Sequence, residues 1–149
     1  MIKLLLHTNA DWVLTMTRLF LGLIFFAHGA QKLLGWFGGP GLHATLQTFA
    51  QHLRIPAPIA LLVISAELFG GLGLMLGLLS RIAAVGIVLT MLGAVAVHYR
   101  NGLFMDWYCS RKGHGIEYHL LAIALGLVVI VKGAGAFSMD YLCYQHYLG

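Results

Sequence analysis

Apolar residues gather in four long runs along the chain, and short polar segments separate these runs. A helix rises about 1.5 Å per residue, so roughly 20 apolar residues cross a hydrocarbon layer about 30 Å thick. We predict membrane-spanning helices over about residues 12–34, 57–79, 82–99 and 115–131. Only Ser80 and Arg81 separate the second run from the third, which forces these two helices to pack antiparallel as neighbours. The pattern therefore predicts an all-α integral membrane protein, a four-helix antiparallel bundle.

Residues 41–53, between the first two runs, place apolar and polar side chains on opposite faces of a helix. The apolar positions are Leu42, Leu46, Phe49, Ala50 and Leu53, and the polar positions are His43, Gln47, Gln51 and His52. We expect a short amphipathic interfacial helix in the first loop. A loop helix that caps the bundle fits the same pattern.

The composition agrees with a membrane protein. Of the 149 residues, 60% are hydrophobic and 9% are charged, and the mean hydropathy is +0.86, which is far from the average of soluble domains. Four spans use most of the chain, so residues 1–149 are interpreted as a single transmembrane domain with no room for a soluble catalytic domain. The partner that the composition predicts is the lipid bilayer, and no feature of the chain points to nucleic acid.

Lysine and arginine residues near the predicted helix ends are distributed unevenly between the two membrane faces. The face that carries both termini and the second loop has Lys3, Arg81 and Lys132. The other face has Lys32, Arg54, Arg100, Arg111 and Lys112. Because cytoplasmic loops are enriched in these residues, the count of three against five favours cytoplasmic first and third loops, with both termini together on the other side.

Ionisable side chains inside or at the rim of the apolar runs are the candidates for function. They are Arg18, His28, Glu67, His98, Glu117 and His119. An Arg or Asp at the centre of a membrane helix costs roughly 2.5–3.5 kcal/mol on insertion scales, so such groups mark sites by default. By helical rise, one membrane face carries His28, Lys32, His98, Glu117 and His119. We predict that these five form a polar pocket that binds a quinone headgroup or passes protons.

Two further charged residues lie apart from this group. Glu67 is roughly 15 Å from the face that carries the pocket, and Arg18 approaches from the opposite leaflet. A structural ion pair between Arg18 and Glu67 would satisfy both charges and fix the register of the first two helices. The alternative is that Glu67 stays unpaired and belongs to a proton path with the His28 and His98 region. Both interpretations are open at this stage.

The candidate ligands do not match a metal centre. Glu117 and His119 are two residues apart and point about 200° apart around a helix, whereas di-iron bundles need Glu and His three apart on one face. We therefore predict no metal site. Haem is disfavoured, because its axial ligands would have to be His28 and His98, the one plausible pair at matched depth. The cofactor stays open, and a quinone is compatible with the pocket.

The two cysteines give little support for thiol chemistry. Cys109 lies in the third loop and Cys143 follows the fourth run, so a spanning fourth helix would place them on opposite membrane faces. They form no Cys-x-x-Cys motif, which is the main feature of dithiol redox enzymes. Each is interpreted as an inert or interfacial thiol.

Four blocks, in order along the chain, carry a recognisable pattern. They are Arg18-Leu-Phe-Leu-Gly-Leu-Ile-Phe-Phe-Ala-His-Gly-Ala-Gln-Lys-Leu33 with Gly35-Trp-Phe-Gly-Gly, Glu67-Leu-Phe-Gly-Gly-Leu-Gly-Leu with Ser80-Arg-Ile-Ala-Ala, His98-Tyr-Arg-Asn-Gly-Leu-Phe-Met, and Gly115-Ile-Glu-Tyr-His-Leu-Leu with Gly133-Ala-Gly-Ala-Phe-Ser-Met-Asp140. These blocks resemble the signature of the DoxX family of small bacterial membrane proteins. The resemblance begins at Arg18 and ends near Asp140, so it covers nearly the whole chain.

The resemblance implies a bacterial cytoplasmic (inner) membrane protein similar to the small subunit of a thiosulfate:quinone oxidoreductase. Some relatives look like partners of redox enzymes, and distant eukaryotic relatives look like membrane chaperones. The family signature falls on Arg18, His28, Gly29, Lys32, Glu67, Arg81, His98, Gly102, Glu117 and Asp140. Leu103, where the family more often has an aromatic residue, and the loop over residues 107–114 depart from the pattern. Partner or substrate specificity in the third loop is therefore the property that can least be carried over from the family to this chain.

Two functions from different classes follow. The first is a membrane subunit linked to quinone or thiol redox or electron transfer, accessory to a partner redox enzyme; whether it is itself an enzyme stays open. The second is a non-catalytic membrane assembly or scaffold protein. A small-solute transporter is the weakest hypothesis, because four short helices leave little room for alternating access unless the chain forms a homo-oligomer.

Overall fold

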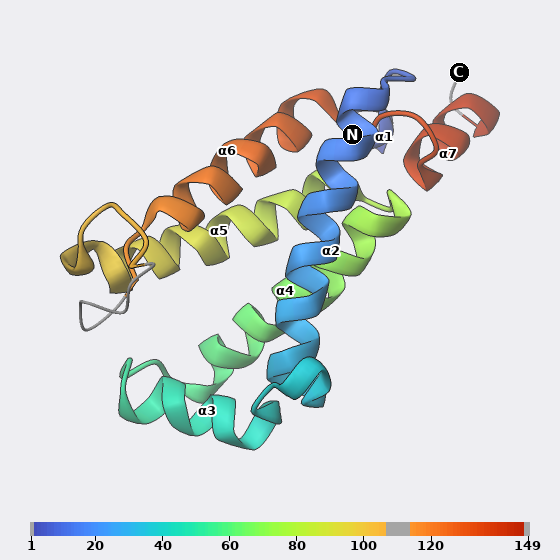
Figure 1. Cartoon of the computed structure of the whole chain (residues 1–149). Coiled ribbons are helices and arrows are strands. Elements are labelled where there is room, and N and C mark those ends of the chain that lie inside the picture. Colours follow the sequence, from blue (N-terminus) through green and yellow to red (C-terminus); the bar gives the residue numbers. More distant parts are fainter. Residues whose placement is uncertain (1, 107–113, 148–149) are drawn as a thin grey trace.

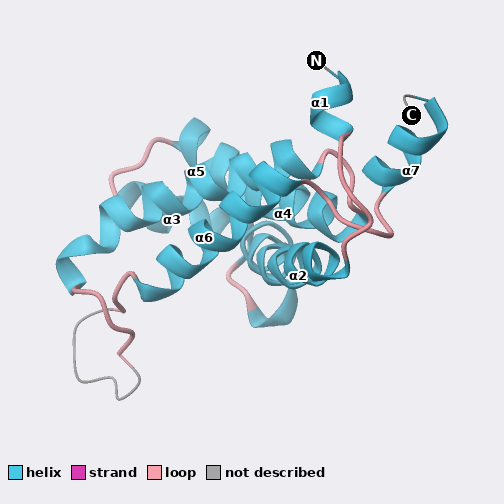
Figure 2. Ribbon diagram, turned by 90° about the horizontal axis from the view of Figure 1, so that it is seen from above, coloured by secondary structure: helices cyan, strands magenta, loops and turns pink. Residues whose placement is uncertain are grey.

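The computed structural model describes residues 2–106 and 114–147, and within these ranges the chain is helical, with no strand (Figure 1, Figure 2). The α-helices are α1 (Ile2–Leu6), α2 (Trp12–Leu34), α3 (Gly41–Gln51), α4 (Ala57–Leu76), α5 (Ser80–His98), α6 (Glu117–Lys132) and α7 (Met139–Tyr147). Short 3₁₀ helices, η1 (Trp36–Gly38) and η2 (Tyr99–Asn101), follow α2 and α5. The all-α class predicted from the sequence is confirmed.

Among the described residues, three helices are long and apolar enough to cross a membrane: Trp12–Leu34, Ala57–Leu76 and Ser80–Asn101. They correspond to the first three predicted spans and make the chain a multi-pass membrane protein. The second ends three residues earlier than expected because Gly77 adopts a left-handed backbone conformation, with φ 66°, and caps α4. At 16 residues, α6 is shorter than these three helices.

The long helices are arranged in two pairs that share a corner (Figure 1). One pair is α2 with α4 and the other is α5 with α6, and the pairs diverge from the turn between α4 and α5. Glycine lets α2 and α4 approach closely. A Cβ atom on Gly29 would overlap the backbone of Leu68, and one on Gly71 would overlap the backbone of Phe26. Any larger residue at these glycines would push the two helices apart.

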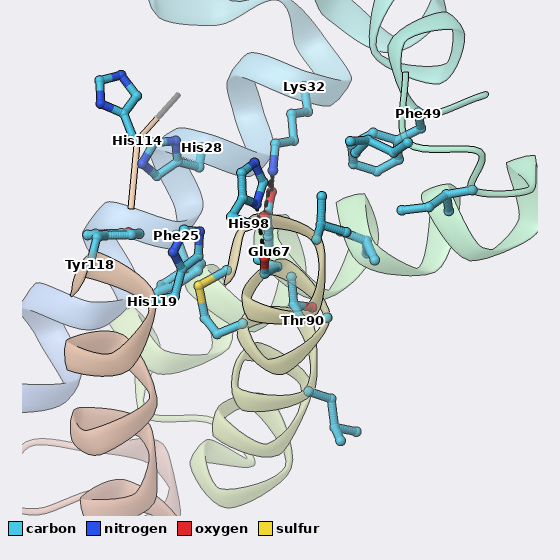
Figure 3. A pocket seen from close by; sticks show the side chains of 18 of the residues that line it. Phe25, His28, Lys32, Phe49, Glu67, Thr90, His98, His114, Tyr118 and His119 are labelled. Atoms are coloured by element: carbon cyan, nitrogen blue, oxygen red, sulfur yellow. Dashed lines mark hydrogen bonds and ion pairs between the residues drawn. The ribbon is translucent and has the colours of Figure 1, made fainter. Parts of the chain in front are cut away.

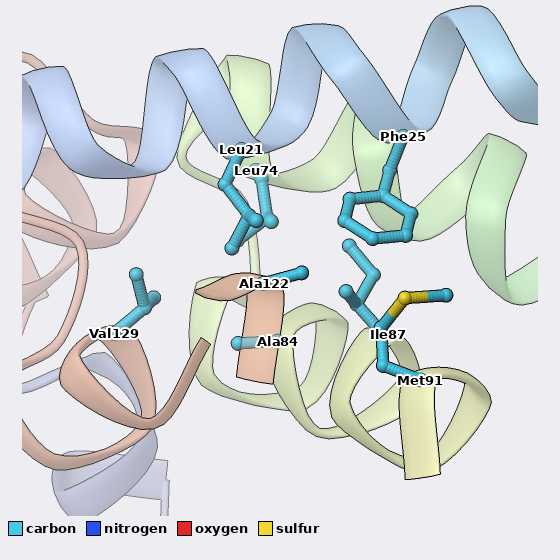
Figure 4. Packing of buried hydrophobic residues seen from close by; sticks show 8 residues of the cluster. All are labelled: Leu21, Phe25, Leu74, Ala84, Ile87, Met91, Ala122 and Val129. Carbon is cyan, nitrogen blue, oxygen red and sulfur yellow. The ribbon is translucent and has the colours of Figure 1, made fainter. Parts of the chain in front are cut away.

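Buried apolar side chains from all four long helices meet between the two pairs (Figure 4). They are Leu21, Phe25, Leu74, Ala84, Ile87, Met91, Ala122 and Val129. Each of them is at most 4% exposed. Because α6 contributes Ala122 and Val129 to this core, it is held against the three longer helices along much of its length.

Four charged side chains and one hydroxyl bind backbone groups at helix termini at one end of the molecule, which we call the capping end (Asp11, Thr15, Arg18, Arg81 and Asp140). Arg18 is 1% exposed. Its guanidinium donates hydrogen bonds of 2.7–3.4 Å to the carbonyl oxygens of Leu74, Met75, Ala134, Ala136 and Phe137. The first two belong to the C-terminal turn of α4, where unpaired carbonyls and the helix dipole both favour a cation.

The predicted ion pair between Arg18 and Glu67 is therefore wrong. Arg18 extends toward the near end of the helices and satisfies backbone carbonyl groups there, whereas Glu67 pairs with Lys32. A long side chain near a helix end reaches the closer polar surface, and in this protein that surface is backbone.

Arg81 caps a second helix C-terminus at the same end. Its guanidinium donates hydrogen bonds to the carbonyl oxygens of Ile130 and Val131, in the last turn of α6. It also donates to the carbonyl oxygen of His7, just after α1. Arg81 thereby ties the start of α5 to the end of α6 and to the N-terminal segment.

Carboxylates cap the helix N-termini at the capping end. Asp140, which is 2% exposed, accepts hydrogen bonds of 2.7 and 2.8 Å from the backbone N–H groups of Leu79 and Ser80, at the start of α5. Asp11 accepts from the first backbone N–H groups of α2. All four long helices therefore have a charged cap of the sign that the helix dipole favours at this end.

The helices α1 and α7, which the sequence analysis did not predict, also lie at the capping end (Figure 1). They contact each other, and the rings of His7 and Tyr144 meet edge to face with centroids 5.2 Å apart. The first and last described residues thus lie at the same end of the molecule.

Candidate functional site

A cavity of about 810 Å³ lies between the two helix pairs, at the end of the helices opposite the capping end (Figure 3). Helices α2 to α6 all contribute to its wall. Its polar lining residues are His28, Lys32, Glu67, Thr90, His98, Asn101, His114, Tyr118 and His119. The volume falls in the range of small-molecule sites, which is about 300–1,000 Å³.

An ion pair between Lys32 and Glu67 forms part of the cavity wall (Figure 3). Lys32 Nζ lies 2.6 Å from each carboxylate oxygen of Glu67. The Glu67 side chain is 3% exposed and the Lys32 side chain 28%. Glu67 is therefore paired and is not the free carboxylate of the alternative interpretation. The pair joins the last turn of α2 to the middle of α4.

Two histidine rings stack in the cavity wall. His98, at the end of α5, and His119, in the first turn of α6, have ring centroids 5.5 Å apart and ring planes at 16°. His98 Nδ1 lies 2.9 Å from the carbonyl oxygen of Ala94. Because a carbonyl only accepts, this nitrogen carries a hydrogen, and a neutral ring then leaves Nε2 as an acceptor.

Two buried polar atoms of the cavity residues make no hydrogen bond of regular geometry within the described part of the chain. They are Tyr118 Oη and His119 Nδ1, and both are shielded from solvent. The His119 ring also has a weaker hydrogen-bond contact with the backbone of Ile116, one turn earlier. The two side chains meet edge to face with ring centroids 5.7 Å apart. Leaving a buried polar atom unpaired costs about 1–3 kcal/mol, so each such atom needs an explanation.

The remainder of the wall is mostly apolar. Helix α3 contributes Phe49, and Leu53 follows it, so the amphipathic segment turns part of its apolar face toward the cavity. Thr45 on α3 hydrogen-bonds to the carbonyl oxygen of Lys32, 3.3 Å away. This contact holds α3 next to the residue that binds Glu67.

The structure places four of the five predicted pocket residues in the cavity wall: His28, Lys32, His98 and His119. Glu117 is exposed and does not line the cavity. Its carboxylate accepts a hydrogen bond of 3.2 Å from the backbone N–H of Met105. Neighbouring residues on a helix point about 100° apart, so turning Tyr118 and His119 toward the cavity turns Glu117 away.

Sequence reasoning missed four polar residues of the wall, namely Thr90, Asn101, His114 and Tyr118. Tyr118 could have been found from its place four residues before Ala122, which is buried in the core. The backbone carbonyl of His114 accepts a hydrogen bond from the Asn101 side chain. This hydrogen bond links the two described sides of the third loop beside the cavity.

The departures from the family pattern in the third loop are described only in part. Residues 107–113, with Cys109, lie outside the described ranges. Cys143 is a half-buried free thiol on α7, away from the cavity lining. Within residues 2–106 and 114–147, no three His, Cys, Asp or Glu side chains are grouped so that they could hold a metal ion.

Comparison with known proteins gives a consistent picture. The family model of DoxX matches residues 13–100. A relative from Bacillus subtilis (strain 168), named "Putative oxidoreductase CatD", is 34% identical over 128 residues, which cover 86% of this chain and 84% of the relative. An uncharacterised membrane protein from Mycobacterium tuberculosis, Rv3486, is 28% identical over 144 residues, covering 91% and 84%. No solved structure matches significantly.

Proposed function

Because the chain belongs to the DoxX family, we propose that it is an integral membrane subunit that binds a quinone and assists a partner oxidoreductase in electron transfer. The name of the Bacillus subtilis relative supports a redox role. The chemistry of the cavity supports a quinone as the molecule bound.

One observation carries this proposal: a largely apolar cavity that holds two unpartnered buried polar atoms, Tyr118 Oη and His119 Nδ1. A quinone headgroup is a flat apolar ring with two carbonyl oxygens, which only accept hydrogen bonds. The Tyr118 hydroxyl can donate to one oxygen, and the His119 ring can donate from Nδ1 when that nitrogen is protonated. In this proposal the two rings turn toward the bound ligand, which then supplies hydrogen-bond partners for both atoms.

The surrounding charges suit a ligand that takes up electrons. A quinone accepts two electrons and two protons to become a quinol, and in this proposal the partner enzyme supplies the electrons. The Lys32 ammonium, on the cavity wall, favours negative charge on the ligand oxygens. The stacked rings of His98 and His119 can hold and release a proton beside the ligand.

The proposal includes a membrane arrangement. We place α6 as a fourth, short span, because the core holds it against the other three helices and its 16 residues reach about 24 Å. The four spans then form an antiparallel bundle, and α3 lies at the interface over the cavity. In the bacterial inner membrane, the charge count places the first and third loops in the cytoplasm and both termini on the other side.

A binding titration tests the quinone site. The purified protein, in mild detergent, is titrated calorimetrically with decylubiquinone. Replacing Tyr118 with Phe removes one hydrogen bond to the ligand and should weaken binding about 5- to 10-fold, which corresponds to about 1–1.5 kcal/mol.

The matched control is Tyr147→Phe, at the far end of the molecule, where the side chain is 77% exposed. This variant should bind like the parent protein. If the parent protein shows no saturable binding, the quinone proposal fails and the assembly or scaffold function takes its place.

A further inference from the structure

We infer that the cavity continues into an apolar subsite between α4 and α5, which takes the hydrocarbon tail of the ligand and opens sideways to the bilayer. This inference rests on the proposed function, since it assumes that the polar part of the cavity holds the headgroup. It adds two points to that proposal. The ligand is a quinone with a long hydrocarbon tail, and it enters the site from the bilayer.

The first step is the spacing of the lining residues. On α4 they include Ile59 and Val63, four residues apart, and the next position in this row is Glu67. On α5, Leu89, Gly93 and Val97 also follow at intervals of four. Residues four apart lie on one face of a helix. Two apolar rows therefore line one crevice, which leads from the loop end toward the depth of Glu67.

The second step is the exposure of these rows. Ile59 is 51% exposed, Leu89 63% and Val97 39%, so the rim of the crevice lies on the surface that faces lipid. The two helices diverge away from their shared turn (Figure 1), and the crevice lining includes exposed residues from both of them. A tail in this crevice would cover exposed apolar side chains on both helices.

Gly93 leaves open space in the α5 row that lines the crevice. A Cβ atom at this position would meet no other atom within 4 Å, whereas one at Gly71, in the α2 and α4 contact, would overlap a neighbouring helix. Gly93 therefore does not serve close helix packing. It leaves open space in the row that lines the crevice, where a larger side chain would occupy the room of the tail.

Binding of two probes to variants of the purified protein separates the tail site from the headgroup site. The probes are decylubiquinone and its tailless analogue, 2,3-dimethoxy-5-methyl-1,4-benzoquinone. Gly93→Leu should weaken the binding of decylubiquinone about 10-fold, because a chain of methylenes loses its pocket, and should change that of the tailless probe by less than about 2-fold. Comparing variant with parent for each probe cancels the partition of the tail into detergent.

Two further variants make the test independent of one substitution. Val63→Phe fills the crevice from α4 and should reproduce the effect of Gly93→Leu. Ala96→Leu adds the same bulk to α5 at an exposed position outside the cavity lining and should bind both probes like the parent.

The outcomes are distinguishable. Absence of saturable binding of both probes to the parent protein would refute the proposed quinone site itself. Binding of both probes that is unaffected by Gly93→Leu and Val63→Phe would overturn the tail subsite and leave the headgroup site standing. An equal loss of both probes in these variants would overturn it as well, because the substitutions would then act on the headgroup.

Discussion

The two ends of the molecule use polar and charged residues in different ways. At the capping end, Arg18 and Asp140 are 1% and 2% exposed, and both are bonded to backbone groups at helix termini. At the cavity end, Tyr118 and His119 line a space of about 810 Å³, and each has a buried polar atom that makes no regular hydrogen bond among the described residues. The side chains at the capping end stabilise the fold, and those at the cavity end line a space that a ligand can fill.

The contrast lies in what surrounds the polar atoms. The capping end also has unpartnered atoms within the described residues, Ser80 Oγ and Arg81 Nε. However, the other two nitrogens of Arg81 are bonded to backbone carbonyls, and neither residue lines a cavity. An isolated unpaired atom in packed surroundings indicates a small energetic cost, whereas two beside an apolar cavity indicate a binding site.

The largest expected effect is that of Arg18→Met. This change removes the donor for five buried or partly buried carbonyl groups, in the last turn of α4 and in the segment after α6. We expect a loss of more than about 4 kcal/mol in the free energy of unfolding, because each unpaired buried carbonyl costs about 1–3 kcal/mol. Thermal unfolding in mild detergent measures it. Arg100→Met, at an exposed position, is the control and should stay within about 0.5 kcal/mol of the parent.

A smaller effect is expected for the Lys32 and Glu67 pair. Glu67→Leu leaves Lys32 without its partner, which typically costs 3–5 kcal/mol for a buried pair. Since Lys32 is 28% exposed and can turn into the cavity, we expect about 2–3 kcal/mol. The double variant Lys32→Met with Glu67→Leu should regain most of this loss, because two apolar side chains can replace a buried ion pair.

This double variant sharpens the comparison between the two ends. The acceptors of Arg18 are backbone carbonyls, so no second substitution can remove them and rescue Arg18→Met. If Lys32→Met with Glu67→Leu is as unstable as Glu67→Leu alone, the stranded lysine is not the cause of the loss. The Lys32 and Glu67 pair would then stabilise the fold in the same way as the charged residues of the capping end.

The fold was largely predictable because hydrophobic length determines a membrane span. The runs of apolar residues identified the helices directly, and the turn at Ser80 and Arg81 identified the antiparallel neighbours. Depth, counted by helical rise, also grouped His28, Lys32, His98 and His119, because residues at one depth on packed helices meet. The short helices α1 and α7 were missed, since five and nine residues carry little periodic signal.

The errors at the site have one physical origin: depth does not determine the direction in which a side chain points. Glu117 has the depth of the cavity and faces away from it. The Arg18 and Glu67 pair failed for a related reason, because side-chain charges were matched with each other and the carbonyl groups at helix ends were not considered. Those carbonyls are invisible in a pattern of residue types until the helix boundaries are known.

The smallest expected change in stability is the most informative one. It comes from removing one hydroxyl group at each end of the molecule. Thr15, at the capping end, is 3% exposed, and its hydroxyl lies 3.0 and 2.7 Å from the carbonyl oxygens of Asp11 and Ala136, between which its one hydrogen is shared. Thr15→Val keeps the shape and loses these bonds, so it should destabilise the protein by about 1–2 kcal/mol. Tyr118→Phe removes a hydroxyl that has no partner among the described residues, so it should leave stability unchanged or raise it by up to about 1 kcal/mol.

Thermal unfolding without added quinone measures both changes in one experiment. A loss in Tyr118→Phe equal to that in Thr15→Val would mean that the Tyr118 hydroxyl is bonded in the free protein. The hydroxyl could then not be a hydrogen-bond donor that stays unpaired until a ligand binds. Unchanged or higher stability, together with weaker quinone binding, is the behaviour expected of a residue that is retained for binding at the expense of the fold.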